Sequence, residues 1–196
     1  MGILENWDVT IEELNEIIAT RPSLRGILIG FLAEYKISKL WFSDKRITDL
    51  IRYDNHDRQR HGDFGLTYRG VRISVQVKSL QTVSVQKTPK GYTGTFQCDA
   101  SDRRPARLPN GDVVETTCLV VGGFDLLAVN LFEFGQKWRF AFARNEDLPR
   151  TTHAKYTPEQ QRHLLATSMR ISWPLQAPFR DEPFILLDEI ARTRRR

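Results

Sequence analysis

The sequence predicts a single α/β domain with a mixed central β-sheet flanked by helices. Residues 10–42 have the periodicity of two helices, residues 63–78 alternate between apolar and polar side chains, and further strand and helix signals follow. The 196 residues, 40% of them hydrophobic, suit one domain with one core. Within residues 1–196 we expect an N-terminal helical segment over residues 1–22 and a basic tail over residues 191–196.

Two helices are expected in the first part of the chain. Thr10–Glu13 forms a capping box that opens a short helix, and Pro22 interrupts this helix. A longer helix is predicted over Ser23–Phe42, because apolar residues recur there at helical spacing. Gly26 and Gly30 each weaken that helix by about 1 kcal/mol relative to alanine. We therefore expect that they pack closely against a neighbour or that the helix begins later.

A β-hairpin is predicted over residues 63–78. An Arg69-Gly70 turn sets Tyr68 opposite Val71 and Asp63 opposite Gln76. One face is then apolar and can pack on a core: Phe64, Leu66, Tyr68, Val71, Ile73, Val75 and Val77. The opposite face holds Asp63, Gly65, Thr67, Arg72, Ser74, Gln76 and Lys78. Because a slip of one residue would exchange the faces, the apolar pattern specifies the register.

The rest of the chain predicts further strands and two closing helices. Residues 80–111 are rich in turn-forming and basic residues. The expected elements are a strand near Tyr92–Cys98, a buried strand over Phe124–Phe132, an alternating strand over Lys137–Ala143, a helix from Thr157-Pro158 to about Met169, and a helix after Pro183.

Asp63, Gln76 and Lys78 converge at one end of the predicted hairpin. Opposed side chains on paired strands lie about 4.5–5.5 Å apart, and residues two apart on one strand point the same way. A carboxylate, an amide oxygen and an ammonium group on one patch can hold a hard cation and orient a water molecule. Glycine at position 65 leaves room beside them. The alternative is a solvated polar face on which Asp63 and Lys78 simply pair.

These residues carry a resemblance to a known family. Gly62-Asp63-Phe64, followed by Val75-Gln76-Val77-Lys78-Ser79, resembles the PD-(D/E)XK nuclease superfamily in its Gln-x-Lys form. That form is similar to methyl-directed restriction nucleases and some transposon end-cleaving nucleases. The segment Gly30–Glu34 resembles the family's N-terminal helix, which contributes an additional acidic residue. The resemblance covers residues 23–80 and implies a restriction-endonuclease-like core.

The resemblance implies a metal-dependent DNA nuclease. Mg²⁺, for which Mn²⁺ can substitute, would be bound by Asp63 and by Glu34, directly or through water. Gln76 replaces the more common acid, so metal binding would depend more on Glu34 and on the Val77 carbonyl. Lys78 would orient a water that attacks phosphorus and, with the metal, would stabilise the developing charge. The alternative for Glu34 is an ordinary surface position on its helix.

Basic residues near the hairpin are candidates for DNA contacts. Loops that present lysine and arginine suit phosphate contacts, although the alternative is a flexible solvated loop. The candidate DNA-binding residues are Arg58, Arg60, Lys87, Lys90, Arg103, Arg104 and Arg107. The C-terminal arginines supply four of the five net positive charges, so the overall charge alone says little about nucleic acid.

Other candidate sites have simpler interpretations. His56-Asp57 and His61 suggest a metal phosphohydrolase only if further histidines support them, so we expect a polar loop. The alternating aromatic residues Trp138, Phe140 and Phe142 could stack on bases, but such a pattern favours core packing. The two cysteines, Cys98 and Cys118, are far apart in sequence and are expected to be reduced thiols rather than zinc ligands.

The function expected from the sequence is a Mg²⁺-dependent endonuclease acting on DNA, foremost a restriction-type enzyme. A Holliday-junction or repair nuclease is the nearest alternative. Two others are a non-catalytic DNA-binding subunit that keeps the fold and a structural subunit of a larger complex. A homodimer is expected because such enzymes usually cut both strands. With neither a long apolar run nor a leader pattern in the chain, we expect a cytoplasmic protein without membrane contact.

Overall fold

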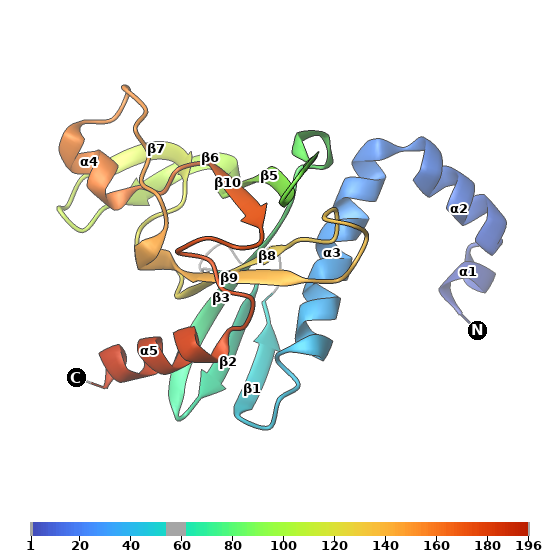
Figure 1. Cartoon of the computed structure of the whole chain (residues 1–196), viewed down its shortest axis with the longest axis horizontal. Coiled ribbons are helices and arrows are strands. Elements are labelled where there is room, and N and C mark those ends of the chain that lie inside the picture. Colours follow the sequence, from blue (N-terminus) through green and yellow to red (C-terminus); the bar gives the residue numbers. More distant parts are fainter. Residues whose placement is uncertain (1, 54–61, 196) are drawn as a thin grey trace.

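The computed structural model describes residues 2–53 and 62–195, and it is built around a mixed central sheet (Figure 1). The strand order is β1-β2-β3-β8-β9, in which β3 and β8 run parallel and all other neighbours run antiparallel. The strands are β1 (Ile47–Arg52), β2 (Phe64–Tyr68), β3 (Val71–Ser79), β8 (Leu126–Asn130) and β9 (Phe140–Arg144). The expected α/β class with a mixed central sheet and flanking helices is confirmed.

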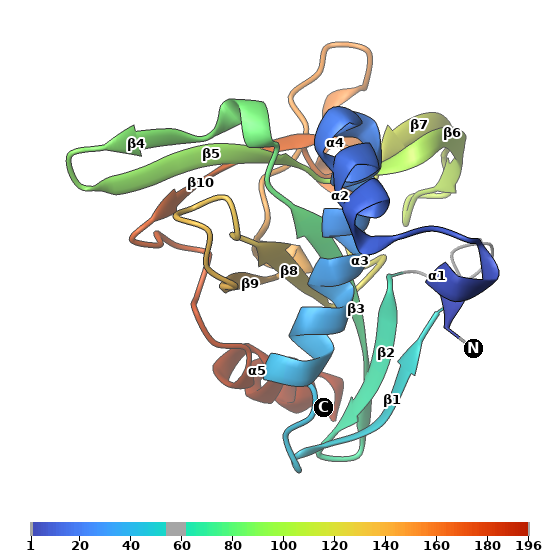
Figure 2. The same ribbon diagram turned by 90° about the vertical axis from the view of Figure 1, so that its right-hand side faces the viewer.

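Two smaller sheets lie in the connection from β3 to β8 and beyond it. Parallel neighbours need a crossover, which is usually helical, yet here the described crossover is built mainly from strands. One sheet has the order β10-β5-β4 and the other is a two-stranded hairpin of β6 and β7. Their bounds are β4 (Gln86–Thr88), β5 (Gly91–Gln97), β6 (Asp99–Arg107), β7 (Val113–Cys118) and β10 (Ser168–Trp173). Figure 2 shows β4 and β5 extending away from the central sheet.

The helices lie at both ends of the chain, as predicted. Thr10 caps α2 with the expected capping box, and Thr157 caps α4 with proline at the first helical position. The helices are α1 (Ile3–Asn6), α2 (Ile11–Thr20), α3 (Pro22–Leu40), α4 (Pro158–His163) and α5 (Phe184–Arg194). Most of the basic tail expected over residues 191–196 belongs to α5, where Arg194 pairs with Asp125 at 2.6 Å.

The two larger clusters of core residues lie on opposite faces of the central sheet, and a smaller third cluster is formed by Leu108, Cys118, Tyr156 and Leu164. One of the larger clusters packs α3 and α5 against the apolar face of the hairpin, and the other packs the sheet against residues of β5 and β10. The strand β8 contributes to both of these, because Leu126 and Ala128 face the first cluster while Leu127 and Val129 face the second. Burial on both faces explains why the sequence of this strand is almost continuously apolar.

The hairpin has the predicted register. Phe64 pairs with Val75, Leu66 with Ile73 and Tyr68 with Val71. The turn residues Arg69 and Gly70 both have positive φ angles, 49° and 77°, as a tight hairpin turn requires. The predicted apolar face is buried except for partly buried Val71, so burial of this face fixes the register as the alternation indicates.

Three expectations for the later elements were wrong or incomplete. Residues 99–107 form a strand, not a turn-rich loop. The helix that starts at Pro158 ends at His163, and residues 168–173 are a strand instead of its continuation. The strand predicted over Lys137–Ala143 begins only at Phe140, and Phe140 and Phe142 are buried core residues, as the preferred interpretation expected.

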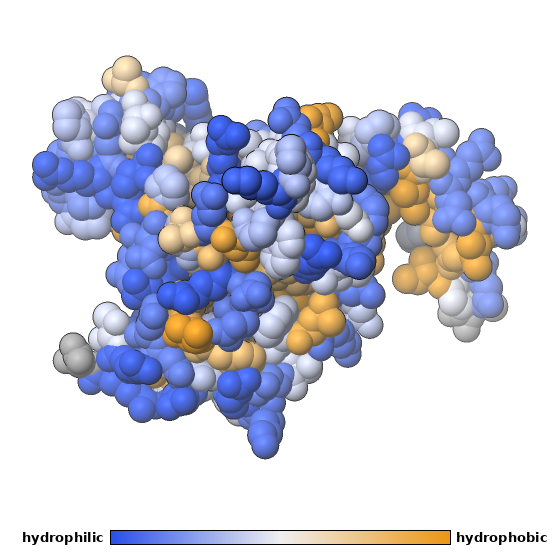
Figure 3. All heavy atoms as spheres, viewed as in Figure 1, coloured by the Kyte–Doolittle hydropathy of each residue, from blue (hydrophilic) through white to orange (hydrophobic). Residues whose placement is uncertain are grey.

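The N-terminal helices expose apolar side chains. No residue of α1 or α2 is buried, and Trp7, Ile11 and Ile17 are largely exposed. Figure 3 shows hydrophobic surface gathered on this segment, which extends from the body of the molecule beside α3. No helix among the described residues is long and apolar enough to cross a membrane.

Replacing Gly26 or Gly30 with alanine is expected to raise the free energy of unfolding by about 1 kcal/mol each. From the sequence we expected either that these glycines pack closely against a neighbour or that the helix begins later, and both expectations were wrong. The helix begins at Pro22, and an added Cβ at either glycine would meet no atom within 4 Å outside the adjoining helix. Urea unfolding of the single variants measures the gain. Gly65→Ala is the contrasting variant, since its Cβ would lie 2.7 Å from Cζ of Tyr53. A lower midpoint for both helix variants would contradict this prediction.

Candidate active site

The side chains of Asp63 and Gln76 meet as the hairpin register predicted. Asp63 lies directly before β2, where its backbone N–H donates to the carbonyl of Val75 at 2.8 Å. Its Oδ2 accepts hydrogen bonds from Nε2 of Gln76 and from the backbone N–H of Val77, both at 2.6 Å. These bonds engage one carboxylate oxygen and fix the orientation of the group.

The amide of Gln76 therefore presents its nitrogen, and not its oxygen, to Asp63. This arrangement differs from the metal-ligand role that the resemblance implies for Gln76. In the structure, the amide acts as a donor that positions the carboxylate. The neutral side chain makes this contact possible, because a carboxylate at position 76 would repel Asp63 at the same distance.

Lys78 lies on the same face but does not pair with Asp63. Its Nζ donates to the backbone carbonyl of Asp99 at 2.8 Å. Asp99 begins β6, so this bond joins the central sheet to the β6–β7 hairpin (Asp99–Cys118). The simple alternative, an Asp63–Lys78 ion pair on a solvated face, is not what the described residues form.

Glu34 lies on α3 and is partly buried, with 14% of its side chain exposed. Its Oε2 accepts a hydrogen bond from Nε of Arg52, the last residue of β1, at 2.7 Å. The Arg52 guanidinium also lies over the ring of Phe31, 5.5 Å from its centroid. The Arg52 guanidinium thus holds Glu34 near the end of the hairpin.

The pKa of Asp63 is shifted by burial and by nearby charges, including that of Glu34. Burial raises the pKa of Asp63 from its ordinary value of 3.8 to about 6, and the hydrogen bond from Val77 opposes this rise. The negative charge of Glu34 raises this pKa further, while the charges of Lys78 and Arg52 lower it. A cation bound beside Asp63 would relieve both the burial cost and the repulsion.

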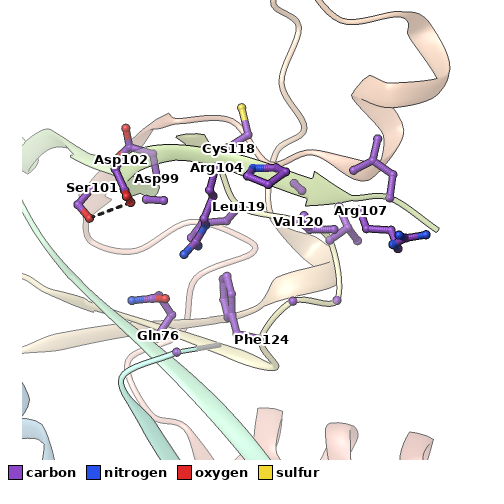
Figure 4. Close-up of a pocket in the computed structure, with 18 of the residues that line it drawn as sticks. Gln76, Asp99, Ser101, Asp102, Arg104, Arg107, Cys118, Leu119, Val120 and Phe124 are labelled. Carbon is purple, nitrogen blue, oxygen red and sulfur yellow. Dashed lines mark hydrogen bonds between the residues drawn. The ribbon is translucent and has the colours of Figure 1, made fainter. Parts of the chain in front are cut away.

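A cavity of about 1040 Å³ opens over the hairpin end (Figure 4). Asp63, Gln76 and Lys78 line its floor, and residues of the β6–β7 hairpin and of the connection to β8 line the other walls. The size is that of a ligand-binding cleft. Glu34 is not among the lining residues, although its charge acts on Asp63.

Gly65 does not leave empty room beside the site. A Cβ at this position would meet Oη of Tyr53 and the guanidinium of Arg72, so these two side chains fill the space. Tyr53 also lines the cavity. The glycine therefore allows an aromatic side chain to lie close to the sheet next to Asp63.

The candidate DNA-binding residues divide into three groups. Arg104 and Arg107 line the cavity, whereas Arg103 is exposed and does not. Two further candidates are exposed and lie away from the cavity lining: Lys87 on β4 and Lys90 in the β4–β5 turn. The remaining candidates and the nearby histidines lie outside the described residues: Arg58, Arg60, His56, Asp57 and His61.

The donor atoms around Asp63 fit a hard divalent cation. Backbone groups of one strand residue point to the same neighbour, so the Val77 carbonyl lies on the side of its N–H, toward Asp63. Mg²⁺ commonly takes one or two carboxylates and keeps several waters. Asp63, the Val77 carbonyl and Glu34 supply such donors, although Glu34 must first leave Arg52. Residues 2–53 and 62–195 contain no cluster of three or more His, Cys, Asp or Glu side chains suited to a metal.

Sequence reasoning missed two contributors to the site. Arg52 lies in an edge strand with only Ile47 buried, so no apolar alternation marks this strand. Asp99 acts through its backbone carbonyl, which any residue type would provide. The two cysteines are free thiols, as expected. Both are buried, and burial raises the pKa of the Cys98 thiol to about 12.

No protein-family model, curated protein or solved structure matches this chain. Its function is therefore inferred from the residues of the site and their geometry.

Proposed function

We propose that this protein is a Mg²⁺-dependent deoxyribonuclease with a restriction-endonuclease-like core. The observation that carries the proposal is the convergence of Asp63, Gln76 and Lys78 on the floor of one polar cavity. In support of the proposal, Asp63 and Gln76 are joined by a hydrogen bond, and Lys78 lines the same cavity. The helix α3, which supplies Glu34, packs against β3.

Each residue has a role in the proposed hydrolysis. Asp63, with its orientation fixed by Gln76 and Val77, has a second carboxylate oxygen that would help to hold the metal. The bound ion would act as a Lewis acid toward the phosphate. Lys78 donates hydrogen bonds toward the water and the phosphate oxygens, and it stabilises negative charge in the transition state. To do so, its ammonium exchanges the Asp99 carbonyl for the substrate.

The test is cleavage of plasmid, forked and four-way DNA with Mg²⁺ and, as a control, with a chelator. Metal-dependent cleavage of plasmid supports the restriction-type role, whereas preference for branched DNA supports the junction or repair role. If no substrate is cleaved with either Mg²⁺ or Mn²⁺, the nuclease assignment is wrong.

A non-catalytic DNA-binding subunit is the second candidate. The observations that favour it are the neutral Gln76 and the ion pair between Glu34 and Arg52, which together leave one uncommitted carboxylate oxygen on Asp63. This candidate predicts metal-independent DNA binding without cleavage. The cleavage assay therefore separates the two functions directly.

Replacing Gln76 with glutamate is expected to make the fold depend on metal. The new carboxylate would face Oδ2 of Asp63 at the 2.6 Å contact, so repulsion should lower the melting temperature in chelator. Mg²⁺ should then raise the melting temperature more than in the wild type, because the site is more negative. Thermal unfolding with and without Mg²⁺ measures both effects. Gln86→Glu, at an exposed position on β4, is the matched control, and equal responses of the two variants would contradict the prediction.

A further inference from the structure

The candidate active site has a roof. The β6–β7 hairpin lies across the cavity from the end of β3, so the cavity is bounded from below by Asp63 and Gln76 and from above by β6 (Figure 4). The hydrogen bond from Lys78 to the Asp99 carbonyl closes this gap at one end. There, a single lysine side chain and one 2.8 Å bond span the distance from floor to roof.

Arg104 projects from the roof into the cavity. Residues along β6 alternate between partly buried and exposed, and Arg104 lies on the partly buried side while Arg103 is exposed. Figure 4 shows the Arg104 side chain extending from β6 toward Gln76 and Phe124. It makes no hydrogen bond or ion pair in the part of the chain that the structure describes, unlike Arg52 and Arg194. Its five donors are therefore free for an anionic ligand.

Cationic side chains stand on both walls of the cavity, among lining residues that also include Asp63, Asp99 and Asp102. Lys78 stands on the floor and Arg104 on the roof, while Arg107 lies on the exposed side of β6. A groove with cations on both sides can bind a phosphate backbone that runs along it. Arginine is suited to such contacts, because its planar guanidinium can form two hydrogen bonds to one phosphate.

The roof limits the space between β3 and β6. Beside Lys78, the gap from floor to roof is spanned by one lysine side chain and its 2.8 Å hydrogen bond, which is much narrower than a DNA duplex. A single strand can pass through such a gap, whereas an intact duplex would have to displace the hairpin. The hairpin is held in place by the Lys78 bond and by packing of Leu108 and Cys118 against Tyr156 and Leu164.

We propose that the substrate is single-stranded DNA, bound between β3 and β6, with Arg104 contacting a phosphate of the strand opposite Asp63. This inference rests on the proposed nuclease function for its catalytic consequence, but the binding mode can be tested separately. The substrate class then covers single-stranded ends, flaps and unpaired segments, and excludes blunt, fully paired duplex.

The first experiment measures binding by fluorescence anisotropy in chelator, so that no cleavage occurs. The probes are a labelled single strand of about 16 nucleotides, the upper end of common site sizes, and the same strand in a blunt duplex. We expect at least tenfold tighter binding of the single strand. Equal or tighter binding of the duplex would overturn the inference.

The second experiment tests Arg104 with a neighbouring control. Arg104→Ala should weaken single-strand binding about tenfold, the loss expected for one charge-assisted contact. It should also reduce the slope of log K against log salt by about 0.7, the value for one phosphate contact on a single strand. Arg103→Ala removes the same charge from the exposed side of β6 and should change the affinity much less. Equal losses in both variants would overturn the role of Arg104.

Cleavage of the same two probes in Mg²⁺ separates this inference from the proposed function. Cleavage of the single strand in preference to the duplex supports both. Preferential cleavage of the duplex keeps the nuclease function and overturns the single-strand inference. If neither probe nor any branched DNA is cleaved, the nuclease function fails, and the binding preference still decides between single-stranded and duplex DNA as the ligand.

Discussion

Asp63→Asn is expected to abolish Mg²⁺-dependent cleavage and, at the same time, to stabilise the folded protein at neutral pH. Cleavage is lost because asparagine removes the negative charge that the metal requires. Stability rises because the buried Asp63 carboxylate is costly, as its pKa of about 6 indicates. The asparagine oxygen can still accept the hydrogen bonds from Gln76 and Val77.

The pH dependence of this stability has a defined sign. Below about pH 4 the carboxyl is protonated in both the folded and the unfolded chain and has no effect. Between about pH 4 and pH 6 the folded chain keeps the proton that the unfolded chain has lost, so stability falls as the pH rises. Above pH 6 the full cost is present, about 3 kcal/mol for a pKa difference of about two units.

Urea unfolding between pH 4 and pH 8 measures this effect in the absence of metal. Asp63→Asn should gain up to about 3 kcal/mol at pH 7 and lose most of the decline between pH 4 and pH 6. Asp181→Asn, at an exposed position, is the control and should leave the profile unchanged. A variant that is less stable than the wild type at pH 7 would refute the prediction.

Lys78→Met is expected to lower the rate of DNA cleavage by a factor of about 10²–10³, the typical cost of removing one donor that stabilises transition-state charge. Methionine keeps most of the length of the side chain, so packing beneath the β6–β7 hairpin should persist. The lost bond joins Lys78 to a backbone carbonyl, and metal binding uses other atoms. Mg²⁺ affinity should therefore change little.

Single-turnover cleavage of a bound substrate is the measurement, because it separates chemistry from binding and product release. Lys87→Met is the matched control, since Lys87 is exposed on β4 and does not line the cavity. If the two variants cleave at equal rates, Lys78 does not act on the reacting atoms. A large loss of Mg²⁺ affinity in Lys78→Met would instead indicate that the lysine organises the metal site.

The hairpin could be predicted because its strands and its turn are specified by residues that are close together in the sequence. Strict alternation from Phe64 to Val77 leaves one register that buries every apolar side chain, and a tight turn at Arg69-Gly70 fixes the pairing. That register alone places Asp63 opposite Gln76, so their contact could be predicted without knowledge of the tertiary structure. The orientation of the Gln76 amide could not follow from it, because the hydrogen bonds around Asp63 decide which end of the amide faces the carboxylate.

The strand β6 could not be predicted from its residues. It pairs only with β7, contains Pro105, and presents polar or charged side chains on both faces. A proline is tolerated in such an edge strand, but it removes the usual signature of a strand. One face of β6 lines a polar cavity rather than a core, so hydrophobic alternation is absent. The contact between Lys78 and Asp99 depends on this packing and has no local signal.

The crossover from β3 to β8 joins, in one stretch of chain, the proposed reactive residues to the hairpin that covers them. Its first residue follows the strand that carries Gln76 and Lys78, and its last residues return to the buried strand β8. Each doubling of a flexible connection costs only about 0.6 kcal/mol, but this crossover is also anchored between its ends, where Leu108 and Cys118 pack against Tyr156 and Leu164. Hairpins of other length or charge that keep those anchors would, under the proposed function, retarget the protein while Asp63, Gln76 and Lys78 stay in place.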